Sequence, residues 1–165
     1  MEDLRFSCCF TGHRQIPVEH MKALYRELDR VLDILIRSGV DRFLAGGALG
    51  FDTLAALTVL DKKEKYPHIR LELCVPCRGQ DSKWSEADKQ NYRYIYENAD
   101  KVTVLNENYT PYCMHQRNRY MVDNSDYCVA YCTESRGGSA YTVEYAQKSG
   151  IKVINLGQRL FSDNS

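Results

Sequence analysis

Residues 43–57 read FLAGGALGFDTLAAL, in which three glycines join a short apolar run to a segment of helical periodicity. The apolar run predicts a buried strand ending near Ala45, and the segment after the glycines predicts a helix beginning near Asp52. Glycine lets the backbone take a positive φ and approach a ligand closely, and a helix start offers unpaired N–H groups and a positive dipole end. Such a turn is therefore suited to binding phosphate or carboxylate groups.

The same alternation of apolar runs and helix-period segments extends along the whole chain. Strands are predicted at 4–10, 42–45, 69–75, 102–105, 127–132 and 151–156. Helices are predicted at 18–38, 52–66, 85–98, 112–124 and 139–149. This order predicts one α/β domain, a three-layer α/β/α Rossmann-like fold with a mostly parallel sheet, over residues 1–158. Residues 159–165 are expected to form a polar, frayed C-terminal tail.

Two further junctions combine glycine with hydroxyl or basic residues. Thr11-Gly12-His13-Arg14 follows the first predicted strand, and Arg136 to Ser139 follow the fifth. Ligands of open parallel sheets bind outside the carboxyl ends of the strands, so all three loops are expected at one edge. One such loop is more often structural, but three at one edge favour a bound anion. Neither a P-loop nor the dinucleotide fingerprint is spelled, so nicotinamide chemistry is not expected.

Composition narrows the classes of protein and partner. The 165 residues, 44% of them hydrophobic, suit one domain with its own core. Lys plus Arg equal Asp plus Glu at 22 each, which argues against nucleic acid as a partner because no global positive field attracts phosphates. The start, MEDLRFSCCFTG, lacks the cations of a signal peptide, and no segment reaches membrane-spanning length. We therefore expect a cytoplasmic protein without membrane association.

The seven cysteines are expected to be free, buried thiols. Cys74 and Cys77 have the spacing of a redox pair, but they end a strand instead of opening a helix. No second C-x-x-C completes a zinc site, so no metal is expected. Cys8 and Cys9 should point to opposite faces of the sheet because they are adjacent in a strand.

Five motifs, taken in order along the chain, resemble the YpsA family of the SLOG superfamily. They are TGHR (11–14), GGALGFDTLAA (46–56), KWSE (83–86), RNRYMVDNSD (117–126) and RGGSAYTVEYA (136–146). The resemblance covers residues 4–155 and gains its specificity from the order and combination of the motifs. More distantly, the second and last motifs resemble the Rossmann-like domain of the DNA-processing protein A family.

This resemblance implies a Rossmann-like domain that binds a nucleotide or nucleotide-derived small molecule at the glycine loops. The superfamily also contains the lonely-guy phosphoribohydrolases, which hydrolyse nucleoside monophosphates with a P-G-G-x-G-T-x-x-E motif. Here the corresponding stretch lacks the proline, and Glu144 lies near, but not at, the position of that glutamate. Since no convincing nucleophile or acid/base pair is present, we expect a ligand-sensing or signalling module without catalytic residues.

The candidate ligand-binding residues come from the three loops and from the family motifs. They are Thr11, Gly12, His13, Arg14, Gly46, Gly47, Ala48, Gly50, Asp52, Trp84, Arg117, Asn118, Gly137, Gly138, Ser139 and Thr142. Asp52 and Ser139 are also placed to cap helices, a role that can coexist with ligand contact. The planar guanidinium of Arg14 suits phosphate, with a solvated loop side chain as the equal alternative. A lone histidine such as His13 is more often structural.

The remaining candidates have structural alternatives of their own. Arg117 and Asn118 are the preferred ligand-facing pair, with packing of their helix against the loop as the alternative. Arg119 and Asp123 have the spacing of a surface ion pair. Trp84 either covers the site or packs on the helix below it.

Two other functions stay open beside ligand sensing. One is hydrolysis of the N-glycosidic or phosphate bond of a nucleotide, with the carboxylate of Glu144 or Asp52 near the sugar. The other is single-stranded DNA binding, against which the neutral net charge argues. A homo-oligomer is compatible with the sequence. A bulky residue at Gly47 or Gly138 should abolish ligand binding and leave the fold largely intact.

Overall fold

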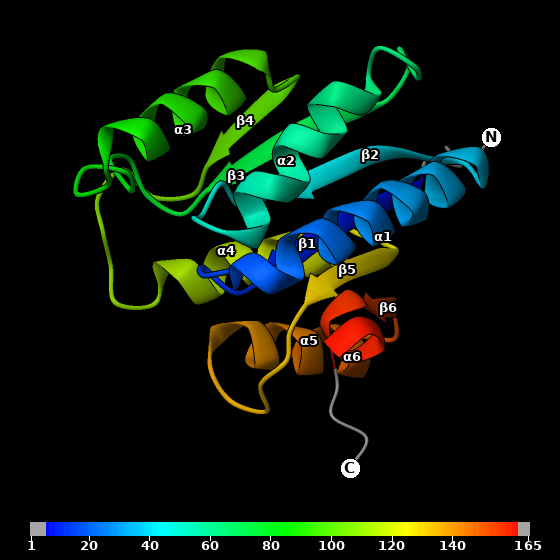
Figure 1. Ribbon diagram of the computed structural model, residues 1–165. Helices are drawn as coiled ribbons and strands as arrows, with labels where there is room; N and C mark the ends of the chain where they lie inside the picture. Colours follow the sequence, from blue (N-terminus) through cyan, green and yellow to red (C-terminus); the bar gives the residue numbers. More distant parts are fainter. Residues whose placement is uncertain (1–5, 162–165) are drawn as a thin grey trace, which may run out of the picture.

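The computed structural model describes residues 6–161, which form a six-stranded parallel sheet and six helices (Figure 1). The strands are β1 (Phe6–Gly12), β2 (Val40–Ala45), β3 (Arg70–Val75), β4 (Lys101–Val104), β5 (Tyr127–Tyr131) and β6 (Lys152–Asn155). The helices are α1 (Val18–Arg37), α2 (Phe51–Lys62), α3 (Glu86–Asn98), α4 (Cys113–Asp123), α5 (Gly138–Lys148) and α6 (Leu156–Phe161). The predicted Rossmann-like α/β architecture is confirmed.

The strand order is β4-β3-β2-β1-β5-β6, with every neighbouring pair parallel. The chain builds outward from β1 to β4 and then crosses back to place β5 on the other side of β1. Strand order therefore reverses between β1 and β5, where Gly12 pairs with Tyr131. A crevice at the carboxyl ends of such strands is the usual place for a ligand in this architecture.

The helices cover both faces of the sheet. α1, α2, α3 and α6 share one apolar cluster with Phe10 and Phe43, whereas α4 and α5 pack on the other face over Cys9 and Leu44. Figure 1 shows α1 and α2 in front of the sheet and α4 behind it. Cys8 belongs to the first cluster and Cys9 to the second, so the expected opposite orientation of these neighbours is confirmed.

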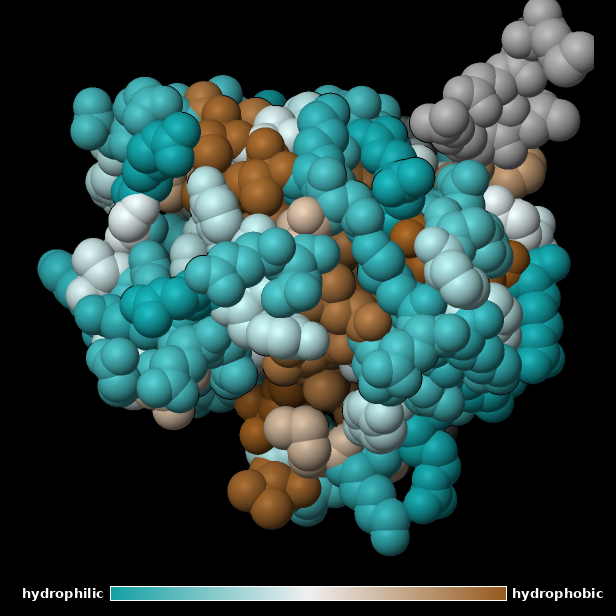
Figure 2. Space-filling model, turned by 90° about the horizontal axis from the view of Figure 1, so that it is seen from above, coloured by the Kyte–Doolittle hydropathy of each residue, from teal (hydrophilic) through white to brown (hydrophobic). Residues whose placement is uncertain are grey.

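Apolar residues also reach the surface. Figure 2 views the molecule from above, on the side of α3 and the edge strand β4, and shows a mostly hydrophilic face broken by a central band of hydrophobic residues. Val102 and Val104 of β4 are only partly buried against the core. Partial exposure is expected for a strand at the edge of a sheet, because no further strand covers its outer side.

Two predictions about local structure are wrong. Residues Leu156–Phe161 form α6, whose Leu156 is buried, so residues 159–161 belong to a helix and not to a frayed tail; residues 162–165 lie outside the described part of the chain. The caps also differ, because α2 and α5 begin after Gly50 and Gly137. Asp52 and Ser139 are the second residues of these helices instead of their N-caps.

Candidate functional site

The loops after β1, β2 and β5 meet at the carboxyl edge of the sheet. The Phe51 amide donates to the carbonyl of His13 at 3.0 Å, which joins the first loop to the second. The amide of Thr133 donates to His13 Nε2 at 2.8 Å, which joins the loop after β1 to the loop after β5. The sequence placed these loops at one edge, and the hydrogen bonds show that His13 is the residue that links them.

Two of the candidate glycines permit close packing between the first two loops. A Cβ at Gly50, where φ is +77°, would lie 2.4 Å from the backbone of Arg14. A Cβ at Gly12 would lie 2.5 Å from Cβ of Phe51. Larger residues would separate the loops, so protein packing alone accounts for glycine at these two positions.

Arg117 is buried beneath the second loop. Its side chain is 3% exposed, and Nη1 donates to the carbonyl of Gly46 at 2.6 Å and to that of Cys74 at 3.3 Å. Its Nε donates to Asn118 Oδ1 at 2.8 Å. A Cβ at Gly46 would lie 2.4 Å from Nη1, so the guanidinium occupies the space that a larger residue would need. These contacts match the structural alternative, in which α4 packs against the loop.

Asp52 lies in the first turn of α2 and is 6% exposed. Burial raises the pKa of its carboxyl to about 6, against the opposing effects of Arg117, the Ala48 amide and Arg14. Burial likewise lowers the pKa of Arg117, against the effect of Asp52. Among the described residues, Oδ1 of Asp52 has no hydrogen-bond partner. This edge of the sheet therefore holds a carboxylate with unused acceptor capacity and a pKa near neutrality.

The loop after β5 is the open part of the site. Gly137 has φ +103° and precedes α5, and a Cβ at Gly137 or Gly138 would meet no atom within 4 Å. The N-terminus of α5 thus faces free space, with N–H groups that no preceding turn of helix can satisfy. Thr142 is 1% exposed and donates to the Gly138 carbonyl at 2.9 Å, so its hydroxyl acts within the helix.

Trp84 packs on α3. Its ring lies edge-on to Tyr92 with the centroids 5.5 Å apart. Tyr92 also limits the space at Gly47, where a Cβ would lie 3.0 Å from Tyr92 and 2.9 Å from Leu73. Gly47 has φ +71°, so a bulky residue there would strain the protein itself. The expectation that substitution at Gly47 leaves the fold intact is therefore wrong, whereas Gly138 has the free space that this expectation requires.

On α4 and α5, the polar contacts at the surface differ from the one ion pair that the sequence predicted. In place of an Arg119–Asp123 pair, Arg119 Nε donates to Tyr141 Oη at 3.0 Å. Asp123 accepts from Tyr145 Oη at 2.8 Å. Glu144 is exposed and forms an ion pair with Lys148 at 2.9 Å. This position gives Glu144 no support as a catalytic carboxylate.

Sequence reasoning missed two residues that contribute to this edge. Gln80 Nε2 donates to the Gly46 carbonyl and to Tyr92 Oη, at 3.2 Å each, and Thr133 supports His13. Neither residue lies in a glycine motif. The available signal was their position shortly after strands β3 and β5, at the edge where the glycine loops were expected.

An all-parallel sheet with glycine loops beside its switch point defines an α/β protein of the Rossmann-like class. The chain belongs to the YpsA family, described as the YspA SLOG family, whose model matches residues 8–155. It is 31% identical over 129 residues to the uncharacterized SPbeta prophage-derived protein YoqJ of Bacillus subtilis, covering 71% of this chain and 75% of that protein.

Two solved structures share the fold. DNA processing protein A from Streptococcus pneumoniae superposes with a TM-score of 0.67 at 20% identity, over 90% of this chain and 49% of that one. The Helicobacter pylori protein, described by its single-stranded DNA binding mode, gives 0.68 at 20% identity, over 96% of this chain and 68% of that one. The chain thus spans about half of the pneumococcal protein.

The shared fold gives no support to the expectation that nucleic acid is not a partner of this chain. Within residues 6–161, no helix combines the length and apolar character needed to cross a membrane. In the same residues, no group of three or more His, Cys, Asp and Glu side chains is arranged to hold a metal ion.

Proposed function

We propose that the protein binds a nucleotide or nucleotide-derived small molecule at the loops after β1, β2 and β5, and acts as a ligand-sensing module without catalysis of its own. The observation that carries this proposal is the open N-terminus of α5 behind Gly137 and Gly138, beside loops that His13 links together. A phosphate group placed there would accept hydrogen bonds from free backbone amides and interact with the positive end of the helix.

Asp52, in the first turn of α2, also supports a nucleotide-type ligand. A carboxylate beside a phosphate would be repulsive, whereas ribose hydroxyls can donate to its unpartnered oxygen. Arg14 is exposed on the first loop, and its guanidinium can pair with a second phosphate oxygen. The proposed ligand therefore carries both an anionic group and a polyhydroxylated ring.

The test substitutes Gly138, where added atoms enter free space. Gly138→Leu should leave the thermal unfolding midpoint nearly unchanged and reduce binding of a nucleotide panel, measured by calorimetry, by at least about tenfold. Gln147→Leu is the matched control, because it adds the same side chain to an exposed position near the other end of α5. Unchanged affinity in Gly138→Leu would contradict the proposal. Chromatography of the same mixtures for free base or phosphate tests the hydrolase alternative.

Single-stranded DNA binding is the second candidate, favoured by the fold shared with the Helicobacter pylori protein. Binding through phosphates should weaken steeply as salt is added, because each neutralised phosphate releases counterions. A fluorescence-anisotropy titration with an oligonucleotide at several salt concentrations measures that slope. Loss of DNA binding in Gly138→Leu would indicate that the DNA binds at the same loops. Absence of DNA binding at low salt would exclude this candidate function.

A further inference from the structure

A hollow of about 860 Å³ lies at the edge of the sheet opposite the glycine loops. It is bounded by residues at or near the starts of the first five strands and by the end of α4. Its lining includes Ser7, Asp41, Arg42, Glu72, Ser125 and Asp126. None of them belongs to the site proposed above, so this space calls for a separate explanation.

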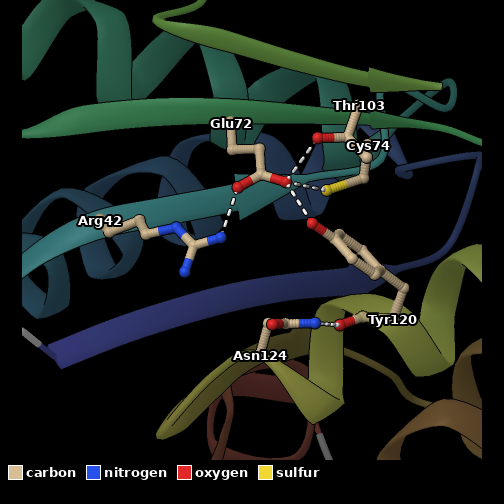
Figure 3. A network of polar contacts seen from close by, with 6 residues as sticks. All are labelled: Arg42, Glu72, Cys74, Thr103, Tyr120 and Asn124. Carbon is tan, nitrogen blue, oxygen red and sulfur yellow. Dashed lines mark hydrogen bonds and ion pairs between the residues drawn. The ribbon is translucent and has the colours of Figure 1, made fainter.

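One side of the hollow is formed by a buried carboxylate whose hydrogen bonds are complete. Glu72 is 2% exposed and receives hydrogen bonds from Arg42 of β2, from Thr103 Oγ1 at 2.8 Å and from Tyr120 Oη at 2.8 Å (Figure 3). Burial acts to raise the pKa of Glu72, but the hydrogen bonds led by Arg42 outweigh it and hold the pKa below its ordinary value. Glu72 and Arg42 thus neutralise each other.

Two other polar groups that line the hollow lack partners. Ser125, which is 9% exposed, has a buried Oγ without a hydrogen bond to any of residues 6–161. Oδ1 of Asp41 is also buried and accepts no hydrogen bond from any of residues 6–161. A buried donor or acceptor without a hydrogen bond is rare in folded proteins, so two such groups beside one hollow point to a ligand that this space accommodates.

Charge decides the kind of partner. The carboxylates that line the hollow are those of Asp41, Glu72, Asp100, Asp123 and Asp126, against the cations of Arg42, Arg70 and Lys101. Arg42 is already engaged with Glu72, and Arg70 lies 3.5 Å from Asp100. An anionic ligand would therefore meet mostly compensated cations, while a cationic ligand would meet carboxylates with free acceptor capacity.

The end of α4 adds to this preference. α4 ends at Asp123, and both Asp123 and Asn124 line the hollow. The C-terminal end of a helix carries a partial negative charge and carbonyl groups without helical partners. Figure 3 shows the side chain of Tyr120 on α4, and that of Asn124 directly after the helix, across from Arg42 and Glu72 on the strands. Groups from both layers therefore surround this space.

We propose that the hollow is a second ligand site, which binds a small organic cation carrying ammonium or guanidinium groups. The N–H groups of such a ligand donate to Asp41 Oδ1 and to the hydroxyl of Ser125, and its charge is compensated by Asp123 and Asp126. Asp126 retains capacity for this role, because within residues 6–161 its carboxylate accepts one hydrogen bond, from the Ser7 amide to Oδ2 at 3.0 Å. The proposal does not depend on the function assigned to the glycine loops.

The test uses agmatine, which carries one guanidinium and one ammonium group, with putrescine and inorganic phosphate as comparison probes. In two-dimensional NMR spectra, agmatine should shift the amide resonances of Asp41, Ser125 and Asp126 and leave those of Gly46 and Gly138 in place. Putrescine should shift the same resonances, more weakly if the guanidinium is the group recognised. Phosphate should not shift them. A shift produced by phosphate and not by agmatine would overturn the proposal, as would no shift with any probe.

Substitutions complete the test. Asp41→Asn and Ser125→Ala should each weaken agmatine binding, the former by about tenfold, which corresponds to about 1.4 kcal/mol. Asp61→Asn is the matched control, since Asp61 is an exposed carboxylate on α2. If Asp41→Asn does not fold, Ser125→Ala decides the matter by itself, because it removes only an unpartnered hydroxyl. Equal affinity in Ser125→Ala and in the unaltered protein would refute the assignment.

Discussion

Asp52 is the residue at which the chemistry of the glycine site can be measured directly. Its carboxyl has a pKa raised by burial from 3.8 to about 6. Between about pH 4 and pH 6 the folded protein therefore binds a proton that the unfolded chain has lost. In this window the contribution of Asp52 to the free energy of unfolding falls as the pH rises, and the full cost of the buried charge is present only when the pH is well above 6.

We predict that Asp52→Asn removes this pH dependence. The free energy of unfolding of the unaltered protein, relative to that of Asp52→Asn, should fall by roughly 2 kcal/mol between pH 4 and pH 6, which is most of the roughly 3 kcal/mol that a shift of about two pKa units contributes over the whole titration. Urea unfolding at several pH values measures the difference. Asp61→Asn, at an exposed carboxylate, should follow the unaltered protein, and a difference curve without slope in this window would contradict the assigned pKa.

The residues of the site differ in how far their roles can be predicted from the residues next to them in the sequence. Gly50, Gly137 and the glycines near them could be read from the sequence, because a strand-to-helix turn that needs positive φ is a local feature. The burial of Arg117 under Gly46 depends on residues 71 positions apart, and the sequence left its role open between ligand contact and packing. Glu72 had a signal that was not used, since it is the one charged residue inside the buried run LELCV.

Among the elements, α4 shows how one helix connects the two edges of the sheet. Its first half carries Arg117, which contacts the second glycine loop, and its second half carries Tyr120, which donates to Glu72 (Figure 3). Glu72 in turn accepts from Thr103 of β4 and from Arg42 of β2. The position of α4 on the sheet is thus fixed by polar contacts in addition to the apolar cluster around Met121.

We predict that Tyr120→Phe destabilises the protein by about 1.5–3 kcal/mol, because a buried carboxylate loses one of its donors. The ring and its apolar contacts are kept, so the change measures the hydrogen bond. Chemical denaturation gives the free energy of unfolding. Tyr94→Phe is the control, since Tyr94 is 53% exposed and should change stability little. A loss for Tyr120→Phe no larger than that for Tyr94→Phe would show that Glu72 does not need this donor.

Most elements could be predicted from periodicity because their buried positions repeat regularly. The predicted helix over 85–98 agrees with α3, whose N-cap is Ser85, where Ser85 Oγ accepts from the Asp88 amide at 3.2 Å. α6 was missed because the polar residues around it suggested a tail, although Leu156 and Phe161 pack on the core formed with α1. A helix of 6 residues has little periodicity of its own, and tertiary contacts decide whether it forms.

Over the whole molecule, the two edges of the sheet offer opposite electrostatic environments. The carboxyl edge presents the N-termini of α2 and α5, and the other edge presents the C-terminus of α4 with a surplus of carboxylates. The net formal charge of zero conceals this separation. Net charge therefore could not decide which partners each edge attracts, because binding follows the local field and not the sum.

All seven cysteines of the molecule are free and buried, as the sequence predicted, and they are distributed over β1, β3, β5, α4 and the loops after β3 and β5. Burial raises the pKa of Cys8, Cys74 and Cys132, which keeps these thiols protonated and unreactive in the folded protein. Their reaction with a thiol reagent therefore requires the structure to open.

We predict that Ellman's reagent modifies all seven thiols rapidly in denaturant and only slowly under native conditions. The native rate should fall when a nucleotide binds at the glycine loops, because a ligand that binds only the folded state lowers the population of open molecules. The unfolding midpoint should be the same with and without a reductant, since no disulfide is present to be broken. Rapid labelling of several thiols under native conditions would show that the core around β1 and β5 opens more readily than its burial implies. A lower unfolding midpoint with reductant would show a disulfide where the structure has free thiols.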